Sequence, residues 1–256
     1  MASSRTYRER EYRKLIGTVI QDRYEITGLL GFGGMGAVYQ ATQQNMQRSV
    51  ALKLIPSDDP KTAARFDREA LTISQLTHPN TVTVFDYGET VDGKLFLAME
   101  MLEGRTLSDV IDWEGPLSPA RAVHITSQVC RSLGEAHDAD IVHRDIKPDN
   151  IFLIEVDEDP DFVKVLDFGI AKVLRSEDDV TLTGEGRIVG TPKYMSPEQI
   201  LAEDVDHRSD IYSLACILYQ MLCGSPPFED ESTTKLMIAH AQEPPPSFAS
   251  RLEDGA

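Results

Sequence analysis

The sequence contains few cysteines. The chain of 256 residues has three, Cys130, Cys216 and Cys223. Three cysteines cannot pair completely into disulfides, and none of them has the CxxC spacing of a metal site. This excludes a disulfide-stabilised secreted domain and favours a reducing, cytoplasmic setting. Cys216 and Cys223 lie seven residues apart in a predicted helix, so we expect two buried thiols on one helix face.

Long hydrophobic runs are also absent. The longest apolar-rich run, 211–223, is interrupted by Tyr212, Ser213 and Gln220, and it is shorter than the roughly 20 apolar residues that a bilayer requires. The N-terminus lacks the apolar core of a signal peptide. We therefore expect a buried helix over 211–223 and no membrane span within this chain. The sequence leaves open whether a membrane anchor follows its C-terminus.

Positive charge is scarce as well. The formal net charge is −17, so electrostatics give no support for a nucleic-acid-binding surface, and we expect no nucleic-acid partner. Residues 1–14 are the exception, with five basic and two acidic side chains. We expect residues 1–22 to form a basic, flexible leader; an arm that touches a membrane or an acidic partner is the alternative.

Length and hydrophobic content allow a substantial core. With 41% hydrophobic residues and no internal repeat, the chain can form one large domain or two small lobes.

The densest group of reactive side chains lies at 143–150, which reads HRDIKPDN. It combines acids, bases and an amide directly before the apolar run 151–154, and charge of that density before a buried strand requires a ligand. A second strand-like run, 163–166, leads into Asp167-Phe168-Gly169. If the two runs form a hairpin, Asn150 and Asp167 lie close together.

These two motifs resemble the catalytic and metal-binding loops of eukaryotic-like (Hanks-type) protein kinases, and Lys147-Pro148 resembles the serine/threonine branch. The resemblance implies that Asp145 accepts the substrate proton and that Lys147 neutralises the γ-phosphate. It also implies ATP and Mg²⁺ as cofactors, with the metal held by Asn150 and Asp167.

A glycine-rich motif follows the predicted strand 24–30. Alone, the GxGxxG spacing is weak, since it also opens dinucleotide-binding units in which a helix comes next. Here the β-rich run 37–42 follows, which predicts a glycine hairpin between two strands. The resemblance implies that the backbone of this hairpin covers ATP. Its residues are Gly31, Phe32, Gly33, Gly34, Gly36 and Val38.

An ion pair is predicted between Lys53 and Glu69. Lys53 lies in the alternating strand 49–55, where the V-A-L-K pattern resembles the kinase strand whose lysine grips the α- and β-phosphates. Glu69 falls within the apolar stripe of a predicted helix over 60–76, where burial without a cation would be costly. The stripe consists of Phe66, Ala70, Ile73 and Leu76.

The adenine contacts are implied by the resemblance alone. The segment 100–104 resembles the hinge that joins the two kinase lobes, where backbone groups of Glu100 and Leu102 would bind adenine. Val38 and Ala51 would cover one side of the ring and Phe152 the other.

The segment 170–194 is polar, threonine-rich and broken by glycine. Because it lies between DFG and Ser196-Pro197-Glu198, it resembles a kinase activation segment. Thr181 and Thr183 are the predicted phosphorylation sites, and a phosphate there would pair with Arg144. The resemblance leaves open a kinase homodimer for trans-autophosphorylation.

The predicted fold class is α+β, a bilobal protein-kinase-like fold. We expect an N-lobe with an antiparallel sheet and one helix over 23–101 and a mainly helical C-lobe over 102–248 that lacks its last helices. A tail follows over 249–256. Asp210, at the start of a predicted helix, is expected to hold the backbone of the catalytic loop.

The predicted function is transfer of the ATP γ-phosphoryl group to serine or threonine hydroxyls of proteins, in signal transduction. One alternative is a pseudokinase-like or incomplete signalling module that binds nucleotide without turnover; the missing C-terminal helices favour it, and the full set of catalytic residues argues against it. Another is a small-molecule kinase such as an antibiotic phosphotransferase. Lys147-Pro148 and the threonine-rich segment favour a protein substrate over that alternative.

Overall fold

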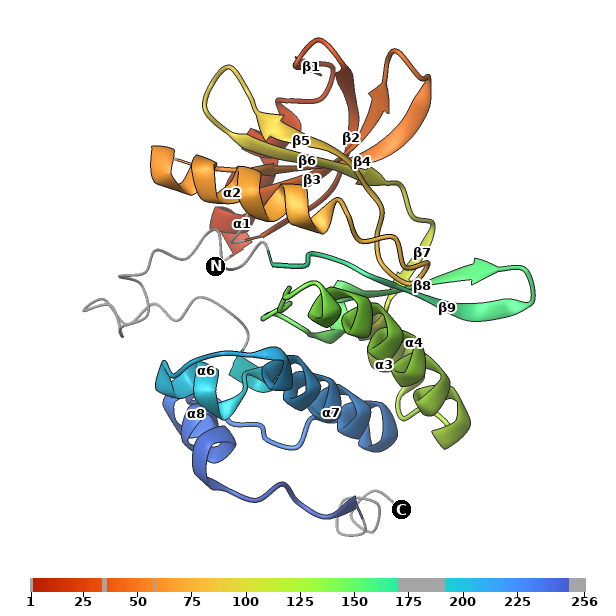
Figure 1. Ribbon diagram of the computed structural model, residues 1–256, viewed down its shortest axis with the longest axis vertical. Helices are drawn as coiled ribbons and strands as arrows, with labels where there is room; N and C mark the ends of the chain where they lie inside the picture. The colour runs from red at the N-terminus through yellow and green to blue at the C-terminus, as the bar shows by residue number, and fades with distance from the viewer. Residues whose placement is uncertain (1, 34–35, 58, 170–191, 249–256) are drawn as a thin grey trace. The chain divides into compact units, whose positions relative to one another are not determined.

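The computed structural model describes residues 2–33, 36–57, 59–169 and 192–248. The chain divides into two compact units (Figure 1). Unit 1 contains Met1–Thr77 and Val82–Leu102, and unit 2 contains His78–Thr81 and Glu103–Ala256. The short segment 78–81 thus belongs with the C-terminal part of the chain, although the residues on both sides of it belong to unit 1.

Unit 1 is built on a six-stranded antiparallel sheet with the order β1-β2-β3-β4-β6-β5. A turn over 90–94 closes the β5–β6 hairpin, with the Thr90 N–H donating to the Lys94 carbonyl (2.7 Å). The turn contains Asp92-Gly93, a pair that is typical of hairpin turns. The strands are β1 (Val19–Ile20), β2 (Tyr24–Gly33), β3 (Gly36–Gln43), β4 (Arg48–Ile55), β5 (Val84–Glu89) and β6 (Leu95–Glu100).

Both faces of the central strand β4 are buried. Because side chains alternate along a strand, Val50, Leu52 and Leu54 share one face, and all three belong to a core cluster with residues of β2, β3 and β6. Lys53 lies on the opposite face and is only 5% exposed. The predicted alternation is therefore confirmed, and it places a lysine in an otherwise apolar strand interior.

Helix α2 (Pro60–Ile73) lies against β5 and β6 (Figure 1). Asp59 caps its N-terminus by accepting a hydrogen bond from the Lys61 N–H (3.1 Å), and Pro60 occupies the first turn. The predicted stripe is confirmed, because Phe66, Ala70, Ile73 and Leu76 are all buried. The helix ends three residues earlier than predicted, so Leu76 packs from the connection that follows it.

The prediction of a flexible leader over residues 1–22 is wrong. Helix α1 spans Ala2–Arg13, and β1 pairs with β2. Tyr12 and Leu15 pack against the unit 1 core cluster, while Arg13 pairs with Glu9 (2.9 Å) on the outer side. The charge-rich composition concealed a helix that is anchored through a few apolar side chains, whereas Tyr7 in the same helix is exposed.

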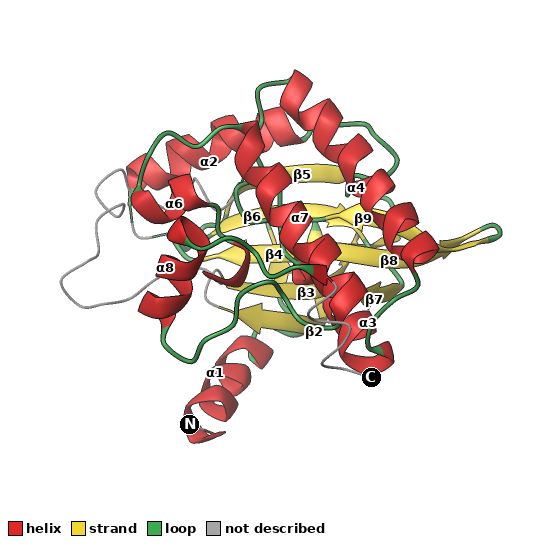
Figure 2. Cartoon of the chain, turned by 90° about the horizontal axis from the view of Figure 1, so that it is seen from below, coloured by secondary structure: helices red, strands yellow, loops and turns green. Residues whose placement is uncertain are grey.

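Unit 2 combines helices with a three-stranded antiparallel sheet of order β7-β8-β9. Helix α4 packs against both α7 and β9, and Figure 2 shows α4 and α7 side by side. The strands are β7 (Gly104–Thr106), β8 (Ile151–Val156) and β9 (Asp159–Val165). The helices are α3 (Leu107–Glu114), α4 (Pro119–Asp138), α6 (Pro197–Leu201), α7 (His207–Cys223) and α8 (Thr233–Gln242), with short 3₁₀ turns η1 (Pro148–Asn150) and η3 (Pro192–Tyr194).

Two helices of unit 2 begin at side-chain caps. Thr106 and Asp109 form a reciprocal capping box at α3. Ser118 caps α4 by accepting from the Arg121 N–H (3.4 Å).

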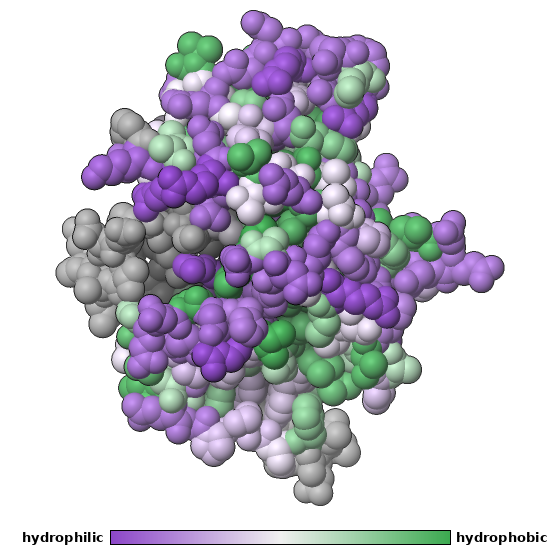
Figure 3. All heavy atoms as spheres, in the orientation of Figure 1, coloured by the Kyte–Doolittle hydropathy of each residue, from purple (hydrophilic) through white to green (hydrophobic). Residues whose placement is uncertain are grey.

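The buried helix predicted over 211–223 is confirmed as the larger part of α7. Its two thiols differ, since Cys216 is buried and Cys223 is only half-buried. No helix in the described ranges is both long enough and apolar enough to cross a bilayer. On the face drawn in Figure 3, hydrophilic side chains predominate and hydrophobic ones form small patches between them.

Candidate active site

The backbone of the HRD segment is held by Asp210, in the first turn of α7. Its Oδ2 accepts from the His143 N–H (2.9 Å) and its Oδ1 from the Arg144 N–H (2.8 Å). This confirms the predicted role of Asp210. Burial would raise the pKa of this carboxyl, but hydrogen bonds from the His137 ring and from the two backbone N–H groups outweigh it and lower the pKa below its ordinary value.

The same loop is joined to the DFG segment through His143. The His143 Nε2–H donates to the Leu166 carbonyl (2.7 Å), and Nδ1 accepts from the Asp145 N–H (3.3 Å). These two bonds select the tautomer protonated at Nε2. The ring also packs against Phe168 with centroids 4.7 Å apart. His143 thus links the loop that carries Asp145 to the residue that follows Asp167.

Asp145 is held on one side only. Its Oδ2 accepts from Lys147 Nζ (2.7 Å) and from Asn150 Nδ2 (3.2 Å). Its Oδ1 accepts no hydrogen bond from any residue that the structure describes. The side chain is 16% exposed. One carboxylate oxygen is therefore oriented by a cation and an amide, while the other keeps its acceptor capacity.

The side chain of Asn150 is oriented in the same way. Its Nδ2 donates to the Asp145 carbonyl (2.8 Å) and to Asp145 Oδ2, which leaves the amide oxygen Oδ1 without a donor among the described residues. The Leu166 N–H donates to the backbone carbonyl of Asn150 (2.9 Å). Because β8 and β9 form the predicted hairpin, Asn150 and Asp167 lie at the same end of it.

Two residues here have left-handed backbone conformations. Arg144 has φ 67° and Asp167 has φ 62°, a region that is costly for residues with a Cβ. The Arg144 carbonyl accepts from Gln199 Nε2 (2.8 Å). Strain of this kind, held by tertiary hydrogen bonds, is typical of functional loops.

In unit 1 the glycine motif forms the tip of the β2–β3 hairpin. Gly33 is paired with Gly36, and Gly31 with Val38. A Cβ built on Gly31 or Gly33 would meet no atom within 4 Å, so open space surrounds both positions. Gly36 has φ 121°, and a Cβ there would lie 2.1 Å from the Leu54 carbonyl oxygen. Gly34 lies outside the described residues.

Three predicted nucleotide contacts share one face of the unit 1 sheet. Val38 is paired with Lys53 across the two strands. Ala51 lies two residues before Lys53 in β4, so their side chains point to the same face. Val38 is half-buried, whereas Ala51 and Lys53 are buried. Glu69 is half-buried on α2, and its ion pair with Lys53 stays a prediction.

The remaining predicted contacts lie at strand ends. In unit 1, Glu100 ends β6, where its N–H donates to the Thr83 carbonyl (2.9 Å), and Leu102 follows it half-buried. In unit 2, Phe152 is half-buried in β8 opposite Thr106. The predicted phosphorylation sites Thr181 and Thr183 lie outside the described residues.

Two residues at the candidate site were missed by sequence reasoning. No motif marks His137, yet its Nε2 lies 2.8 Å from Asp210 Oδ2. Gln199 was not singled out, although it is the N3 residue of a capping box with Ser196. The S-P-E-Q pattern signals that box, but no local pattern predicts the second bond, from Gln199 to Arg144.

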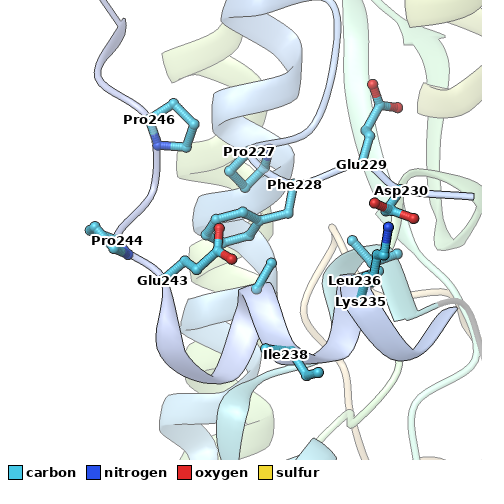
Figure 4. A pocket seen from close by; sticks show the side chains of 11 residues that line it. Pro227, Phe228, Glu229, Asp230, Lys235, Leu236, Ile238, Glu243, Pro244 and Pro246 are labelled. Atoms are coloured by element: carbon cyan, nitrogen blue, oxygen red, sulfur yellow. The ribbon is translucent and has the colours of Figure 1, made fainter. Parts of the chain in front are cut away.

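One pocket in unit 2 involves none of the predicted site residues. It has a volume of about 390 Å³ and lies between α8 and the segments on either side of that helix (Figure 4). Its lining includes Phe228, Glu229, Lys235, Leu236, Glu243 and Pro246.

Comparisons with known proteins agree with the motifs. Residues 24–251 match the model of the protein kinase domain. The chain is 45% identical over 243 residues to serine/threonine-protein kinase pkn3 of Myxococcus xanthus, an alignment that covers 93% of this chain and 44% of that protein. It is 41% identical over 240 residues to PknB of Mycobacterium leprae (91% and 38%) and 43% identical over 235 residues to PknD of Mycobacterium tuberculosis (91% and 34%).

These relatives are much longer proteins, and the chain spans less than half the length of each. The matched region nevertheless contains all the motifs described above, from the glycine hairpin to Ser196-Pro197-Glu198. The resemblance drawn from those motifs is thereby confirmed, and the chain belongs to the protein kinase family, in its bacterial Hanks-type branch.

Proposed function

We propose that this chain is the catalytic domain of an ATP-dependent protein-serine/threonine kinase. The observation that carries the proposal is the one-sided restraint of Asp145. Lys147 and Asn150 hold Oδ2, and Oδ1 has no donor among the described residues. A hydroxyl group of a substrate could donate to that oxygen without displacing a hydrogen bond from any described residue.

In this role Asp145 orients the substrate hydroxyl and accepts its proton as the bond to phosphorus forms. Lys147 keeps Oδ2 in place with one of its three N–H donors. The other two make no hydrogen bond with the described residues and could donate to the oxygens of the transferred phosphoryl group. Asp210 acts indirectly, because it holds the backbone from which Asp145 projects.

The donor set at Asn150 and Asp167 suits Mg²⁺. Hard divalent cations prefer amide and carboxylate oxygens, and Asn150 Oδ1 is oriented by the Nδ2 bonds and accepts nothing from the described residues. When bound, the metal supplies charge neutralisation for the phosphate oxygens. The chain contributes the oxygen ligands and holds their backbones together through the bond between Leu166 and Asn150.

The unit 1 residues support nucleotide binding. The open space around Gly31 and Gly33 would let phosphates approach backbone N–H groups without meeting side chains. Gly34 and Gly36 complete this loop, and Phe32 lies within it. Lys53, oriented by Glu69, would bind the α- and β-phosphates.

We assign adenine to apolar side chains and backbone groups. Val38, Ala51 and Phe152 would cover the faces of the ring, and the backbone of Glu100 and Leu102 would bind its edge. A flat aromatic ligand requires such apolar surfaces with a few polar groups at the rim.

We further propose regulation by phosphorylation of Thr181 and Thr183 in a homodimer, with Arg144 as a partner of the phosphate. An added phosphate carries between one and two negative charges at neutral pH and pairs well with arginine.

Intact-mass spectrometry after incubation with Mg-ATP tests the proposal. The parent chain should gain phosphoryl groups at Thr181 or Thr183, and a generic basic protein should be phosphorylated. Asp145→Ala should lower turnover by about a thousandfold while ATP binding, measured by calorimetry, is retained. Asp149→Ala is the matched control, because Asp149 is exposed in the same loop, and it should leave turnover within about twofold.

Two results would contradict this assignment. Near-normal turnover of Asp145→Ala would exclude Asp145 as the proton acceptor. A folded parent chain that binds ATP but phosphorylates neither itself nor added protein would instead be a binding module.

A further inference from the structure

The helix that replaces the expected flexible leader contacts the glycine hairpin. Tyr12 and Phe32, both in unit 1, pack ring against ring. Their planes are tilted by 35° and their centroids lie 5.5 Å apart, within the range of favourable aromatic pairs. Phe32 is the second-to-last residue of β2, next to Gly33 at the hairpin tip. A segment outside the predicted kinase lobe thus touches the loop that we assign to the phosphates.

The backbone of Tyr12 is fixed at the same time. Its carbonyl accepts a hydrogen bond from the hydroxyl of Tyr39 (3.1 Å). Tyr39 lies in β3 and is fully buried, at 0% exposure. Since Tyr39 is part of the core cluster, this hydrogen bond ties the backbone of Tyr12 to the buried core of unit 1.

The contact lies on the side of the sheet away from the proposed ligand positions. Phe32 is opposite Ala37, and both pack with the core cluster. Gly31 is opposite Val38, which shares the other face with Lys53. Because side chains alternate along the strands, Tyr12 contacts the hairpin on the face that packs with the core cluster. The face that carries Val38 and Lys53 stays available to the nucleotide.

We propose that Tyr12 is a positioning residue that holds the glycine hairpin in a nucleotide-binding conformation. This inference rests on the proposed function, because it assigns a role to a contact of the proposed ATP loop. A hairpin rich in glycine is conformationally free, and ordering it opposes ligand binding. The Tyr12–Phe32 contact reduces that freedom before the nucleotide arrives.

The variant Tyr12→Ala tests the proposal. The KM for ATP should rise about three- to tenfold while kcat stays within about twofold, since an aromatic pair of this kind supports an effect of that size. Amide hydrogen exchange in the hairpin should become faster in the free protein. Tyr12→Phe should restore both values, because the ring is kept and the hydroxyl of Tyr12 makes no hydrogen bond within the described residues.

Two further variants separate positioning from a general loss of structure. Tyr7 lies in the same helix and is 66% exposed. Tyr7→Ala should therefore change neither the KM for ATP nor the amide hydrogen exchange of the hairpin. Phe32→Leu removes the other ring, and Tyr12→Ala should then add little to its effect, because the two residues act through one contact. This pair of variants keeps the proposal testable if Tyr12→Ala folds poorly.

The outcomes are distinct. An unchanged KM and unchanged exchange in Tyr12→Ala would overturn the proposal, and so would additive effects of Tyr12→Ala and Phe32→Leu. If the parent binds ATP but transfers no phosphoryl group, the proposed function fails. The Kd for ATP and the exchange rates of the variants would still decide whether Tyr12 positions the hairpin.

Discussion

His137 and Asp210 lie 2.8 Å apart, Nε2 to Oδ2, and join the helices α4 and α7. Since an ionised carboxylate can only accept, the His137 ring donates. The Asp210 side chain is 1% exposed and receives two further hydrogen bonds from the loop before Asp145. One buried carboxylate therefore connects two helices and the proposed catalytic loop.

Asp210→Asn should destabilise the protein and reduce turnover. An amide has one acceptor oxygen where the carboxylate has two, so at least one buried N–H donor loses its partner. Such a loss costs about 1–3 kcal/mol, and we expect kcat to fall at least about tenfold because the loop that carries Asp145 is no longer held. Urea unfolding and steady-state kinetics measure the two effects. Asp138→Asn, at an exposed position of α4, is the control and should be neutral.

The lowered pKa of Asp210 predicts a pH dependence of stability. Its carboxylate stabilises the fold fully above the ordinary aspartate pKa of about 4, and this contribution is lost as the pH falls through the lower pKa of the folded state. Between pH 5 and pH 2, the free energy of unfolding should therefore fall less steeply in Asp210→Asn than in the parent. Equal slopes for both proteins would show that the pKa of Asp210 is the same in the folded and unfolded states.

Gly36→Ala should disrupt the glycine hairpin. The added methyl group would lie 2.1 Å from the Leu54 carbonyl oxygen, at a residue with φ 121°, and we expect a loss of at least about 2 kcal/mol in the free energy of unfolding. Gly31→Ala is the matched variant, because its methyl group meets nothing within 4 Å. It should remain within about 1 kcal/mol of the parent but bind ATP more weakly. A Gly36→Ala protein as stable as the parent would contradict the predicted clash.

Phe66→Ala should destabilise unit 1 through its core. Phe66 is 1% exposed, and its ring packs edge-on against Tyr87, with centroids 6.5 Å apart. Removal of a buried phenyl ring typically costs about 3–5 kcal/mol. Leu71→Ala changes the outer side of the same helix, where Leu71 is 51% exposed, and should cost less than about 1 kcal/mol. Similar losses in the two variants would mean that α2 does not pack through the predicted stripe.

The cysteines should differ in reactivity. Burial raises the pKa of the Cys216 thiol to about 12, so the reactive thiolate is scarce at pH 8. Cys130 is exposed. Iodoacetamide should modify Cys130 well before Cys216 in the folded protein, and urea should abolish the difference, as peptide mass spectrometry can measure. Equal rates without urea would contradict the burial of Cys216.

Local patterns in the sequence were enough to predict several of the elements. The stripe from Phe66 to Leu76 and the alternation along strand 49–55 depend on residues within a few positions of one another. Short-range periodicity and capping act through the same local backbone geometry in any fold. The family resemblance, carried by motifs such as 143–150, extended those predictions to the fold class.

The leader shows where local patterns fail. Residues 1–14 are charge-rich, and a short helix of this composition is marginal alone. It is stabilised when Tyr12 and Leu15 pack against the sheet, a surface formed by strands later in the chain. No property of the first twenty residues by themselves specifies that surface.

The sequence by itself determined which reactive groups are present and the order in which they occur, because motif spacing and apolar periodicity are local. Only the tertiary structure decided which of them meet. Asp210 and His143 are 67 positions apart, and Gln199 and Arg144 are 55 positions apart. Such contacts depend on how helices and strands pack, and packing is a property of the whole folded unit rather than of any short segment.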